Sequence, residues 1–234
     1  MKKWAIITGC AKGIGKKTAL SLARDGYNII GTYNTSEVLI KDLEKKLNNI
    51  GIEYKFYKVD LSIETEINCF VNAVLKLTTQ IDILVNNAAL SLDCEFIDIT
   101  KEQFLKILDV NLVAPFLLAK KLYSSLANGV IINIASTDGI NTYTEYNIDY
   151  SASKAGLINL TKSLAMVLKD VRVYAICPNW VNTESIQEMN QDYLKEELKR
   201  VGQSNLIEPE SIADEVINLV ESNKKSGSII VMEA

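Results

Sequence analysis

The sequence predicts a single α/β domain built on a doubly wound, seven-stranded parallel sheet with helices on both faces. Short apolar runs alternate with longer amphipathic segments along the whole chain, which is the order that such a sheet requires. The length of 234 residues suits one large domain, and neither a repeat nor a linker divides the chain. A glycine-rich turn also follows the first apolar run directly. We therefore expect one domain over residues 1–234.

The predicted strands are short apolar runs bounded by turns, as is typical of buried parallel strands. They are Trp4–Thr8, Asn28–Thr32, Tyr54–Val59, Ile83–Val85, Val130–Ile134, Arg172–Ile176 and Ser228–Met232. The predicted helices lie between them and carry apolar residues at helical spacing. They are Ile14–Asp25, Ser36–Asn48, Glu64–Leu77, Lys101–Val110, Leu112–Leu126, Ser151–Leu168 and Pro209–Glu221. Thr100 with Gln103 fits a capping box, and Pro209 suits the first position of a helix.

A long irregular segment follows the sixth predicted strand, at residues 179–208. It contains a polar helix at Asp192–Arg200 and the apolar side chains of Trp180, Met189 and Tyr193. Loops that follow the carboxyl ends of strands line the ligand crevice of doubly wound sheets. We interpret the segment as a substrate lid, and the alternative is a purely structural excursion.

The composition excludes several classes of function. A net charge of −4 argues against nucleic acid or an anionic membrane as the main partner. No histidine is present, so His-dependent triads are excluded and no metal site is expected. The four cysteines form no Cys-x-x-Cys pair, and no apolar run approaches the ~18 residues of a membrane span. With no signal peptide apparent, we expect reduced thiols and a cytoplasmic protein.

A glycine-rich turn runs from Thr8 to Gly15, between the first predicted strand and the first predicted helix. Its glycines, Gly9, Gly13 and Gly15, permit a tight turn and a close approach of the backbone to a ligand. The helix that begins at Ile14 then presents amide groups and the positive end of its dipole. This order predicts a dinucleotide pyrophosphate site, although the Gly-x-x-x-Gly-x-Gly spacing differs from Gly-x-Gly-x-x-Gly. The alternative is a structural turn.

Tyr150 and Lys154 stand four residues apart in a predicted helix, which places both side chains on one face. The pKa of a phenol is ordinarily about 10, so tyrosine is a poor acid or base at neutral pH. A neighbouring lysine cation favours the phenolate and lowers that pKa. The pair therefore predicts a tyrosine general acid/base. A surface helix with an exposed lysine is the alternative.

Further polar residues stand where predicted strands end or a helix is interrupted. Asp60 and Leu61 follow the third strand, and the Asp60 carboxylate can accept from an adenine amino group or cap a helix. Amides after the fourth strand can bridge neighbouring strands and shape a crevice, and Ser136 places a hydroxyl at its rim. Asn111 interrupts an apolar helix, where a buried amide needs partners. The amide motif is Asn86-Asn87-Ala88-Ala89.

These motifs, in this order and over essentially the whole chain, resemble those of the short-chain dehydrogenase/reductase family. The matching positions are Thr8-Gly9-x-x-x-Gly13-Ile14-Gly15, Asp60, Asn86-Asn87-Ala88, Asn111, Ser136, Tyr150-x-x-x-Lys154 and Pro178 to Thr183. Within the family the chain is most similar to the 3-oxoacyl-acyl carrier protein reductase branch, and the run Ile30–Glu37 is one reason. The resemblance implies a Rossmann fold and an NAD(P)-dependent oxidoreductase.

The resemblance also implies four catalytic residues. Tyr150 would give a proton to the substrate carbonyl oxygen as hydride reaches the carbon, and Ser136 would hydrogen-bond that oxygen. Lys154 would lower the pKa of Tyr150 and hold the nicotinamide ribose hydroxyls. Asn111 would anchor a water that relays protons from Lys154 to solvent.

The cofactor-binding residues that the resemblance implies cluster after the strand ends. They are Gly9, Lys12, Gly13, Ile14, Gly15, Asn34, Thr35, Asp60, Leu61, Asn87, Ala88, Ala89, Tyr150, Lys154, Pro178, Val181 and Thr183. The backbone around Val181 and the Thr183 hydroxyl would hold the nicotinamide carboxamide. Ala89 and Asn179 replace glycines that are common in the family, and we expect only small effects on geometry.

NADP(H) is expected in preference to NAD(H). An NAD site of this type has an acidic residue at the end of the second strand, whereas this strand ends in Gly31-Thr32-Tyr33-Asn34. Asn34 and Thr35 can donate to a 2′-phosphate. Lys12 is the obvious cation for that phosphate, and the alternative is that it faces solvent.

The implied function is NADPH-dependent reduction of a ketone to a secondary alcohol, with a 3-oxoacyl thioester of fatty acid biosynthesis as the first choice. Another carbonyl or alcohol (a sugar, a steroid-like ring or a diketone) and a non-catalytic NADP-binding regulator are the alternatives. An acidic acyl carrier protein would need basic residues to dock, and the candidates are Lys169, Arg172, Lys195, Lys199 and Arg200. Apolar runs at Leu112–Ala119 and Leu157–Leu168 are consistent with a homodimer, and a homotetramer stays open because the C-terminus is short.

Overall fold

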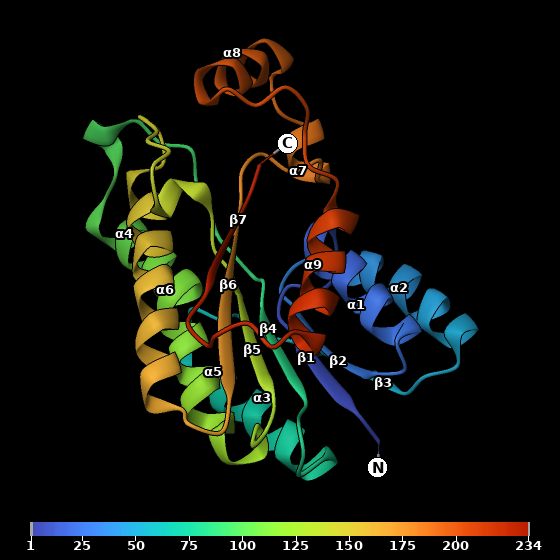
Figure 1. The fold of residues 1–234 in the computed structure, drawn as a ribbon. Helices are drawn as coiled ribbons and strands as arrows, with labels where there is room; N and C mark the ends of the chain where they lie inside the picture. The colour runs from blue at the N-terminus through green and yellow to red at the C-terminus, as the bar shows by residue number, and fades with distance from the viewer. Residues whose placement is uncertain (1, 234) are drawn as a thin grey trace.

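The computed structural model describes residues 2–233, which fold around one seven-stranded parallel sheet (Figure 1). The strands are β1 (Trp4–Ile7), β2 (Asn28–Tyr33), β3 (Tyr54–Lys58), β4 (Ile83–Asn86), β5 (Val130–Ile134), β6 (Arg172–Pro178) and β7 (Ile229–Met232). The α-helices are α1 (Gly13–Arg24), α2 (Glu37–Ile50), α3 (Glu64–Leu77), α4 (Lys101–Leu108), α5 (Ala114–Leu122), α6 (Ile148–Val167), α7 (Glu184–Gln187), α8 (Gln191–Val201) and α9 (Pro209–Glu221). Short 3-10 turns lie at Phe96–Asp98, Tyr123–Ser125 and Thr137–Gly139, and a π-helical turn at Asp109–Val113 joins α4 to α5.

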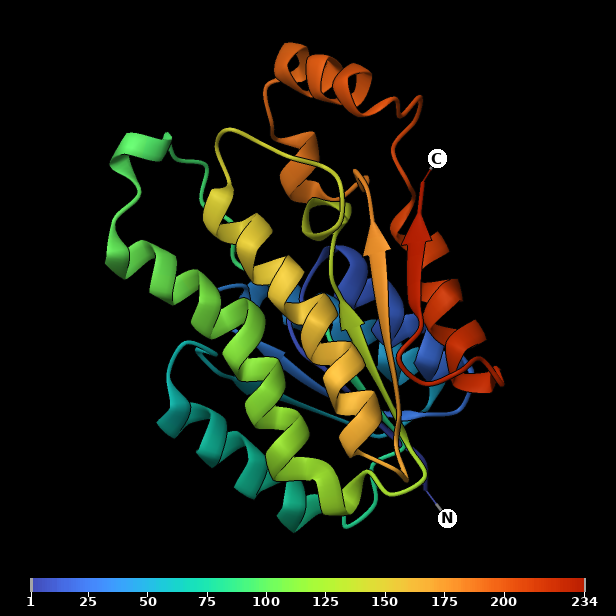
Figure 2. The same ribbon diagram turned by 60° about the vertical axis from the view of Figure 1, so that its left-hand side comes forward.

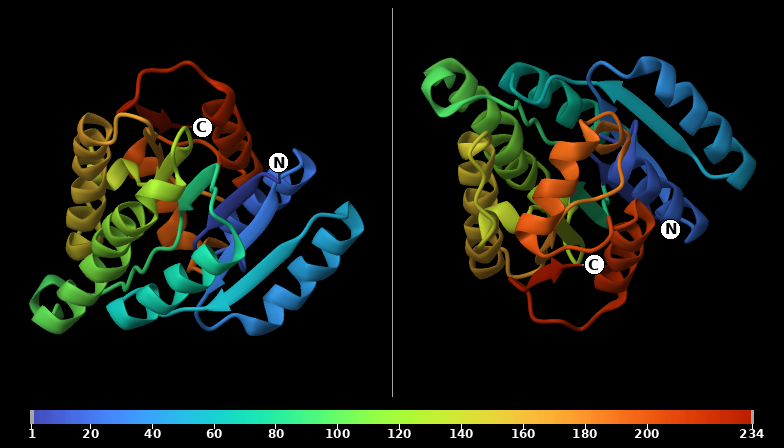
Figure 3. Two further views of the ribbon diagram at one scale, coloured as in Figure 1. Left: turned by 90° about the horizontal axis from the view of Figure 1, so that it is seen from below. Right: turned by 90° about the horizontal axis from the view of Figure 1, so that it is seen from above.

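The sheet has the strand order β3-β2-β1-β4-β5-β6-β7, and each neighbouring pair is parallel. Helices α1, α2 and α9 cover one face, and α3, α5 and α6 cover the other, as the end-on views in Figure 3 show. The apolar core is accordingly divided between the two faces. The predicted fold class is confirmed. The order of strands reverses between β1 and β4, which is where doubly wound sheets bind ligands.

Most predicted elements appear close to their predicted bounds. The strand at Val130–Ile134 and the helices at Glu64–Leu77 and Pro209–Glu221 match at both ends. Strand β6 is longer than expected because it continues through Pro178 beside β7. Helix α6 begins at Ile148, three residues before the predicted start. Helix α7 was not predicted, because four residues are too few to show a helical period.

A chain of buried side-chain hydrogen bonds ties the middle of the sheet to α6. Asn86 donates to Asn133 on the neighbouring strand β5 at 2.8 Å, and Asn133 donates to Thr161 on α6, also at 2.8 Å. Buried polar groups are almost always partnered in native proteins because an unpartnered one is costly. The chain therefore holds α6, which carries Tyr150 and Lys154, in a fixed position against β4 and β5.

Arg172, at the start of β6, caps the C-terminal end of α9. Its guanidinium donates to the carbonyl oxygens of Val220 and Ser222 at 2.8 Å and of Leu219 at 3.4 Å. A cation at this position satisfies carbonyls that lack partners inside the helix. Arg172 and the neighbouring Lys169 lie at the amino ends of the strands, roughly 20 Å along β6 from its carboxyl end. The expectation that these two residues help to dock an acyl carrier is therefore wrong.

None of the helices within residues 2–233 is both long and apolar enough to cross a membrane. Over the same range, no group of three or more Cys, Asp or Glu side chains is arranged to hold a metal ion. All four cysteines are free thiols.

Candidate functional site

A cavity of about 810 Å³ opens along the carboxyl edge of the sheet, where the strand order reverses. Its size is typical of a ligand pocket. Every residue predicted for the site lines it except Gly15 and Asn111. The predicted residues in its wall are Gly9, Lys12, Gly13, Ile14, Asn34, Thr35, Asp60, Leu61, Asn87, Ala88, Ala89, Ser136, Tyr150, Lys154, Pro178, Val181 and Thr183.

The glycine-rich turn leaves no room for side chains. A Cβ atom on Gly15 would lie 2.3 Å from Gly9 O and 2.4 Å from Asn87 Nδ2, and one on Gly9 would lie 2.9 Å from Ala88 Cα. Gly9 and Gly13 have φ angles of 65° and 53°, which glycine adopts far more readily than other residues. The turn thus brings the first backbone amides of α1 to the cavity wall.

Asn87 and Thr8 hold this turn against the end of β4. The Asn87 amide nitrogen donates to Thr8 O at 2.9 Å and to Gly9 O at 3.0 Å. The Thr8 hydroxyl oxygen accepts from the backbone amides of Asn87 and Ala88, each at 3.0 Å. The expectation that these amides bridge neighbouring strands is confirmed.

The amides at the start of α1 fit an anionic ligand such as a dinucleotide pyrophosphate. The first turn of α1 contains no acidic residue, and Lys12 at its N-cap makes no side-chain cap. The amide of Gly13 donates to Glu184 Oε2, at 2.9 Å, so a carboxylate from segment 179–208 already uses this anion-binding position. Backbone amides and the helix dipole together favour negative charge here. A nicotinamide dinucleotide therefore matches the donors of this wall.

Asp60, at the end of the cavity beyond β3, has a local structural role. Its Oδ1 accepts from the backbone amide of Ser62 at 2.9 Å and from the Ser62 hydroxyl at 2.7 Å. The hydrogen bond from this hydroxyl is the main cause that lowers the pKa of Asp60, and the Lys106 cation contributes. Asp60 nevertheless lines the cavity together with Asn34 and Thr35. Lys106 lines it as well and was not predicted.

Tyr150 and Lys154 project into the cavity from the first two turns of α6. The Lys154 ammonium lies 5.3 Å from the centre of the Tyr150 ring, so the two side chains share a face as predicted. Lys154 is only 2% exposed, and its Nζ donates to Ile134 O at 2.8 Å. This excludes the alternative of a surface helix with an exposed lysine.

Burial dominates the electrostatics of this pair. It lowers the pKa of Lys154 from 10.5 to about 8, and it raises the pKa of Tyr150, which the Asp138 carboxylate raises further. A hydrogen bond with the Ser136 hydroxyl acts in the opposite direction on the Tyr150 pKa. The expectation that Lys154 lowers the pKa of Tyr150 below its ordinary value is therefore wrong for this structure. Removal of the phenolate from water outweighs the hydrogen bond with Ser136.

Ser136 begins the loop after β5 and turns it toward the cavity. Its hydroxyl oxygen accepts from the Asp138 backbone amide at 3.1 Å, and Asp138 lines the cavity beside it. Burial raises the pKa of the Asp138 carboxyl. Among residues 2–233, no lysine or arginine forms an ion pair with this carboxylate. Asp138 was not predicted from the sequence. Its position, two residues after the serine that ends the predicted strand, could have indicated that it lies in the site.

Asn111 lies in the π-helical turn between α4 and α5, outside the cavity wall. Its Oδ1 accepts from Leu90 N at 2.8 Å, and its Nδ2 donates to Leu90 O at 2.9 Å and to Ser153 Oγ at 3.0 Å. Both hydrogens of the amide are therefore used by protein partners, and they connect the segment after β4 to α6. The water relay through Asn111 stays a prediction. The wide turn that holds it is a π-bulge, a feature that often occurs at functional sites.

Segment 179–208 leaves the end of β6 and leads into α9, and its two ends meet at one narrow neck. Trp180 O accepts from Ile207 N at 2.9 Å, and the buried Gln203 accepts from Trp180 N and donates to Trp180 O. Beyond the neck, the chain forms α7 and α8, and Figure 2 shows α8 set apart from the layers beyond the carboxyl ends of the strands. Trp180 and Met189 line the cavity, as a segment that contacts a ligand would require.

The low pKa of Lys154 predicts an unusual pH dependence of stability. Between about pH 8 and pH 10 the unfolded chain keeps the Lys154 proton and the folded protein has lost it, so the free energy of unfolding gains from Lys154 as pH rises. The gain is at most about 1.4 kcal/mol per pH unit. The buried Cys10 and Cys177 thiols have raised pKa values and oppose this gain above about pH 9, so the prediction concerns the difference between two proteins. In urea denaturation, the free energy of unfolding of the wild type should rise relative to that of Lys154→Met over this pH range. Lys162→Met, an exposed position on the same helix, serves as the control. Equal slopes in all three proteins would contradict the prediction.

Comparison with known proteins agrees with this geometry. The family model described as short chain dehydrogenase matches residues 3–194. An acetoacetyl-CoA reductase from Rhizobium meliloti is 31% identical over 232 residues, which cover 95% of this chain and 92% of that protein. A 3-oxoacyl-[acyl-carrier-protein] reductase from Synechocystis sp. is 31% identical over 216 residues, which cover 89% of this chain and 85% of that protein.

Solved structures extend the agreement to the backbone. The crystal structure of an acetoin dehydrogenase from Salmonella typhimurium has a TM-score of 0.84 and 26% identity, and the match covers 99% of this chain and 94% of that one. The chain therefore belongs to the short-chain dehydrogenase family, and it is an oxidoreductase of the kind that binds a nicotinamide cofactor.

Proposed function

We propose that the protein uses NADPH to reduce a ketone to a secondary alcohol, with 3-oxoacyl thioesters of fatty acid biosynthesis as its first substrate class. The observation that carries this proposal is the single cavity that Tyr150, Lys154 and Ser136 share with the glycine-rich turn. The substrate class comes from the relatives, since two that are 31% identical are named for acetoacetyl-CoA and for 3-oxoacyl-acyl carrier protein.

The cofactor would lie along the wall between Gly9 and Thr183. The amides that begin α1 suit its pyrophosphate, and the Thr183 hydroxyl suits the nicotinamide carboxamide. β2 does not end in a carboxylate, which would repel a 2′-phosphate. Asn34, Thr35 and Lys12 lie in the cavity wall, where they could bind this phosphate. These features favour NADP(H) over NAD(H).

The residues of the chain would control the proton and the developing charge. A bound nicotinamide supplies the hydride. Tyr150 holds its proton at neutral pH, because a phenol has an ordinary pKa of about 10 and burial raises the pKa of Tyr150 further. The protonated phenol is the form that can give a proton to a ketone oxygen. The Ser136 hydroxyl would donate a hydrogen bond to the same oxygen and stabilise the charge that forms on it. Lys154 remains largely protonated at pH 7 and would stabilise the phenolate that proton transfer leaves behind.

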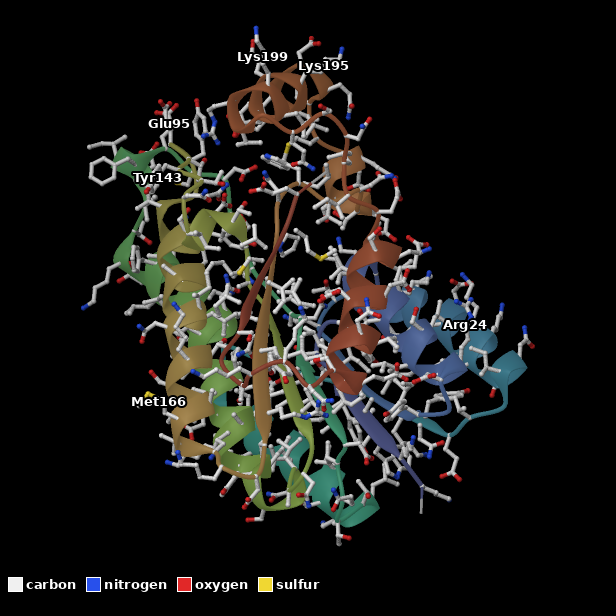
Figure 4. The ribbon with its side chains drawn as sticks, viewed as in Figure 1. Arg24, Glu95, Tyr143, Met166, Lys195 and Lys199 are labelled. Carbon is white, nitrogen blue, oxygen red and sulfur yellow. The ribbon has the colours of Figure 1, made fainter. Side chains whose placement is uncertain are left out.

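If the thioester is carried by an acidic acyl carrier protein, α8 is the element that would dock it. Lys195 and Lys199 point outward from the tip of the molecule (Figure 4), and Lys195 also forms an exposed ion pair with Asp192 at 3.6 Å. Arg200 is bound by Glu197 through two hydrogen bonds, at 2.9 and 2.6 Å, which reduces its value for docking. Electrostatic docking requires a KM that rises with salt for carrier-linked substrates, and a salt-independent KM would contradict it.

A ketone that carries a hydroxyl group beside its carbonyl is a second candidate substrate. Asp138 places a carboxylate in the cavity next to Ser136, and an ionised carboxylate can only accept hydrogen bonds. A 3-oxoacyl group offers acceptors at this point, whereas a hydroxyketone offers a donor. The acetoin dehydrogenase among the similar structures is named for a substrate of this kind.

We also propose a cytoplasmic homodimer or homotetramer. Phe116 on α5 and Met166 and Val167 on α6 are large apolar side chains exposed to solvent, and Met166 points outward in Figure 4. Exposed apolar groups of this kind gather at interfaces between subunits. The free thiols suit a reducing compartment. Light scattering should give at least twice the chain mass of 26.0 kDa, and a monomer mass would contradict the proposed assembly.

The catalytic proposal predicts that Tyr150→Phe lowers kcat by about 10² to 10⁴, because the variant cannot transfer a proton. The assay is oxidation of NADPH with acetoacetyl-CoA, with NADH run beside it, and the dissociation constant for NADPH should stay unchanged. Tyr123→Phe, at a site outside the cavity, is the matched control. Unchanged turnover in Tyr150→Phe would refute the mechanism, and faster turnover with NADH than with NADPH would refute the cofactor preference.

The two substrate classes are separated by Asp138→Val. If Asp138 binds a substrate hydroxyl, the change should lower kcat/KM for acetoin by about 10- to 100-fold, as expected for a hydrogen bond to a charged group. It should raise or maintain kcat/KM for acetoacetyl-CoA. Asp98→Asn, an exposed position outside the cavity, should alter neither value. Equal changes for both substrates would remove the case for a hydroxyketone.

A further inference from the structure

Glu184 reaches the cofactor wall from segment 179–208, and the proposed mechanism makes no use of it. It is the first residue of α7, and its Oε2 accepts from Gly13 N at 2.9 Å. A Cβ atom on Gly13 would lie 3.2 Å from Thr183 Cγ2 and 3.7 Å from the same Glu184 oxygen. Helix α7 therefore packs directly on the glycine-rich turn.

The Glu184 carboxylate stands where an anionic ligand is most favoured. Gly13 is the first residue of α1, so its amide lies at the positive end of the helix dipole. The first turn of α1 has no acidic side chain of its own, and Glu184 supplies the negative charge from elsewhere in the chain. A pyrophosphate that approaches the same amides meets a charge of its own sign.

Ser185, the next residue of α7, contacts Lys12, the residue before Gly13 in the glycine-rich turn. Ser185 Oγ accepts from Lys12 Nζ at 3.0 Å. Lys12 is the cation at the glycine-rich turn that would pair with a 2′-phosphate. Two consecutive residues of α7 thus occupy two groups that the cofactor needs. Glu184 binds an amide suited to the pyrophosphate, and Ser185 binds the cation suited to the 2′-phosphate.

We propose that Glu184 and Ser185 form an internal latch that closes α7 over the glycine-rich turn and competes with the cofactor for it. The pyrophosphate displaces the Glu184 carboxylate from Gly13 N, and the 2′-phosphate displaces the Ser185 hydroxyl from Lys12. The latch lowers the affinity for both dinucleotides and links their binding to the position of α7. This inference rests on the proposed cofactor site.

Direct titration with NADPH and NADH, followed by fluorescence and without a ketone substrate, tests the latch. Glu184→Gln keeps an oxygen for Gly13 N and removes the charge, so it should lower the dissociation constants for both dinucleotides by about three- to tenfold. Ser185→Ala frees Lys12 and should tighten the binding of NADPH more than that of NADH. Glu188→Gln removes the same charge from the exposed end of α7 and should leave both constants within about twofold.

Unchanged or weaker NADPH binding in Glu184→Gln would overturn the latch. Equal tightening of NADPH binding in Glu188→Gln would also overturn it, because the effect would then come from the change in net charge alone. Failure of the proposed function has a different signature. If the wild type binds NADPH but reduces no ketone, the affinity comparison still decides the latch. If neither the wild type nor Glu184→Gln binds a dinucleotide, the cofactor site and the latch both fall.

Discussion

The contact between the glycine-rich turn and the end of β4 is the constraint on which the rest of the site depends. A side chain at Gly15 would strike both Gly9 O and the Asn87 amide within 2.4 Å, so the turn can only close without one. Asn87 then bonds the turn through two backbone carbonyls. Because α1 starts from this turn, its amides face the cavity only while the contact holds. The same contact brings the end of β4 into the cavity wall. The segment that follows β4 contains Leu90, whose backbone bonds the Asn111 side chain, and Asn111 connects this segment to α6.

Desolvation determines what the polar groups of the site can do. Lys154 is buried with its charge satisfied by the carbonyl of Ile134, and it retains its proton only weakly. Tyr150 is held in its protonated form by burial and by Asp138. The same burial makes Tyr150 a weaker acid than a free phenol. The phenolate that forms in either direction of proton transfer therefore needs the adjacent Lys154 ammonium to stabilise it.

The sequence was sufficient for features that depend on local pattern, and insufficient for those that depend on three-dimensional surroundings. The inner strands are apolar and buried, and the edge strands β3 and β7 are short runs rich in aromatic or β-branched residues, so all seven were found. Tyr150 with Lys154 was found because four residues make about one helical turn. The sign of the Tyr150 pKa shift was missed because it depends on how deeply the ring is buried. Arg172 was misjudged because its partners on α9 lie about fifty residues further along the chain. The contacts of α7 were invisible because a helix of four residues has no period.

The narrow neck at Trp180 and Ile207 makes segment 179–208 an excursion whose two ends meet at one point of the fold. No strand of the sheet lies between these residues, and the hydrogen bonds of Gln203 close the base from within the excursion. The entropic cost of closing such a loop grows only slowly with its length. Because α7 contacts the glycine-rich turn, only the part of the segment between α7 and Gln203 can lengthen or shorten without disturbing that turn. Changes there alter the cavity wall near Met189 and leave Tyr150 and Lys154 in place.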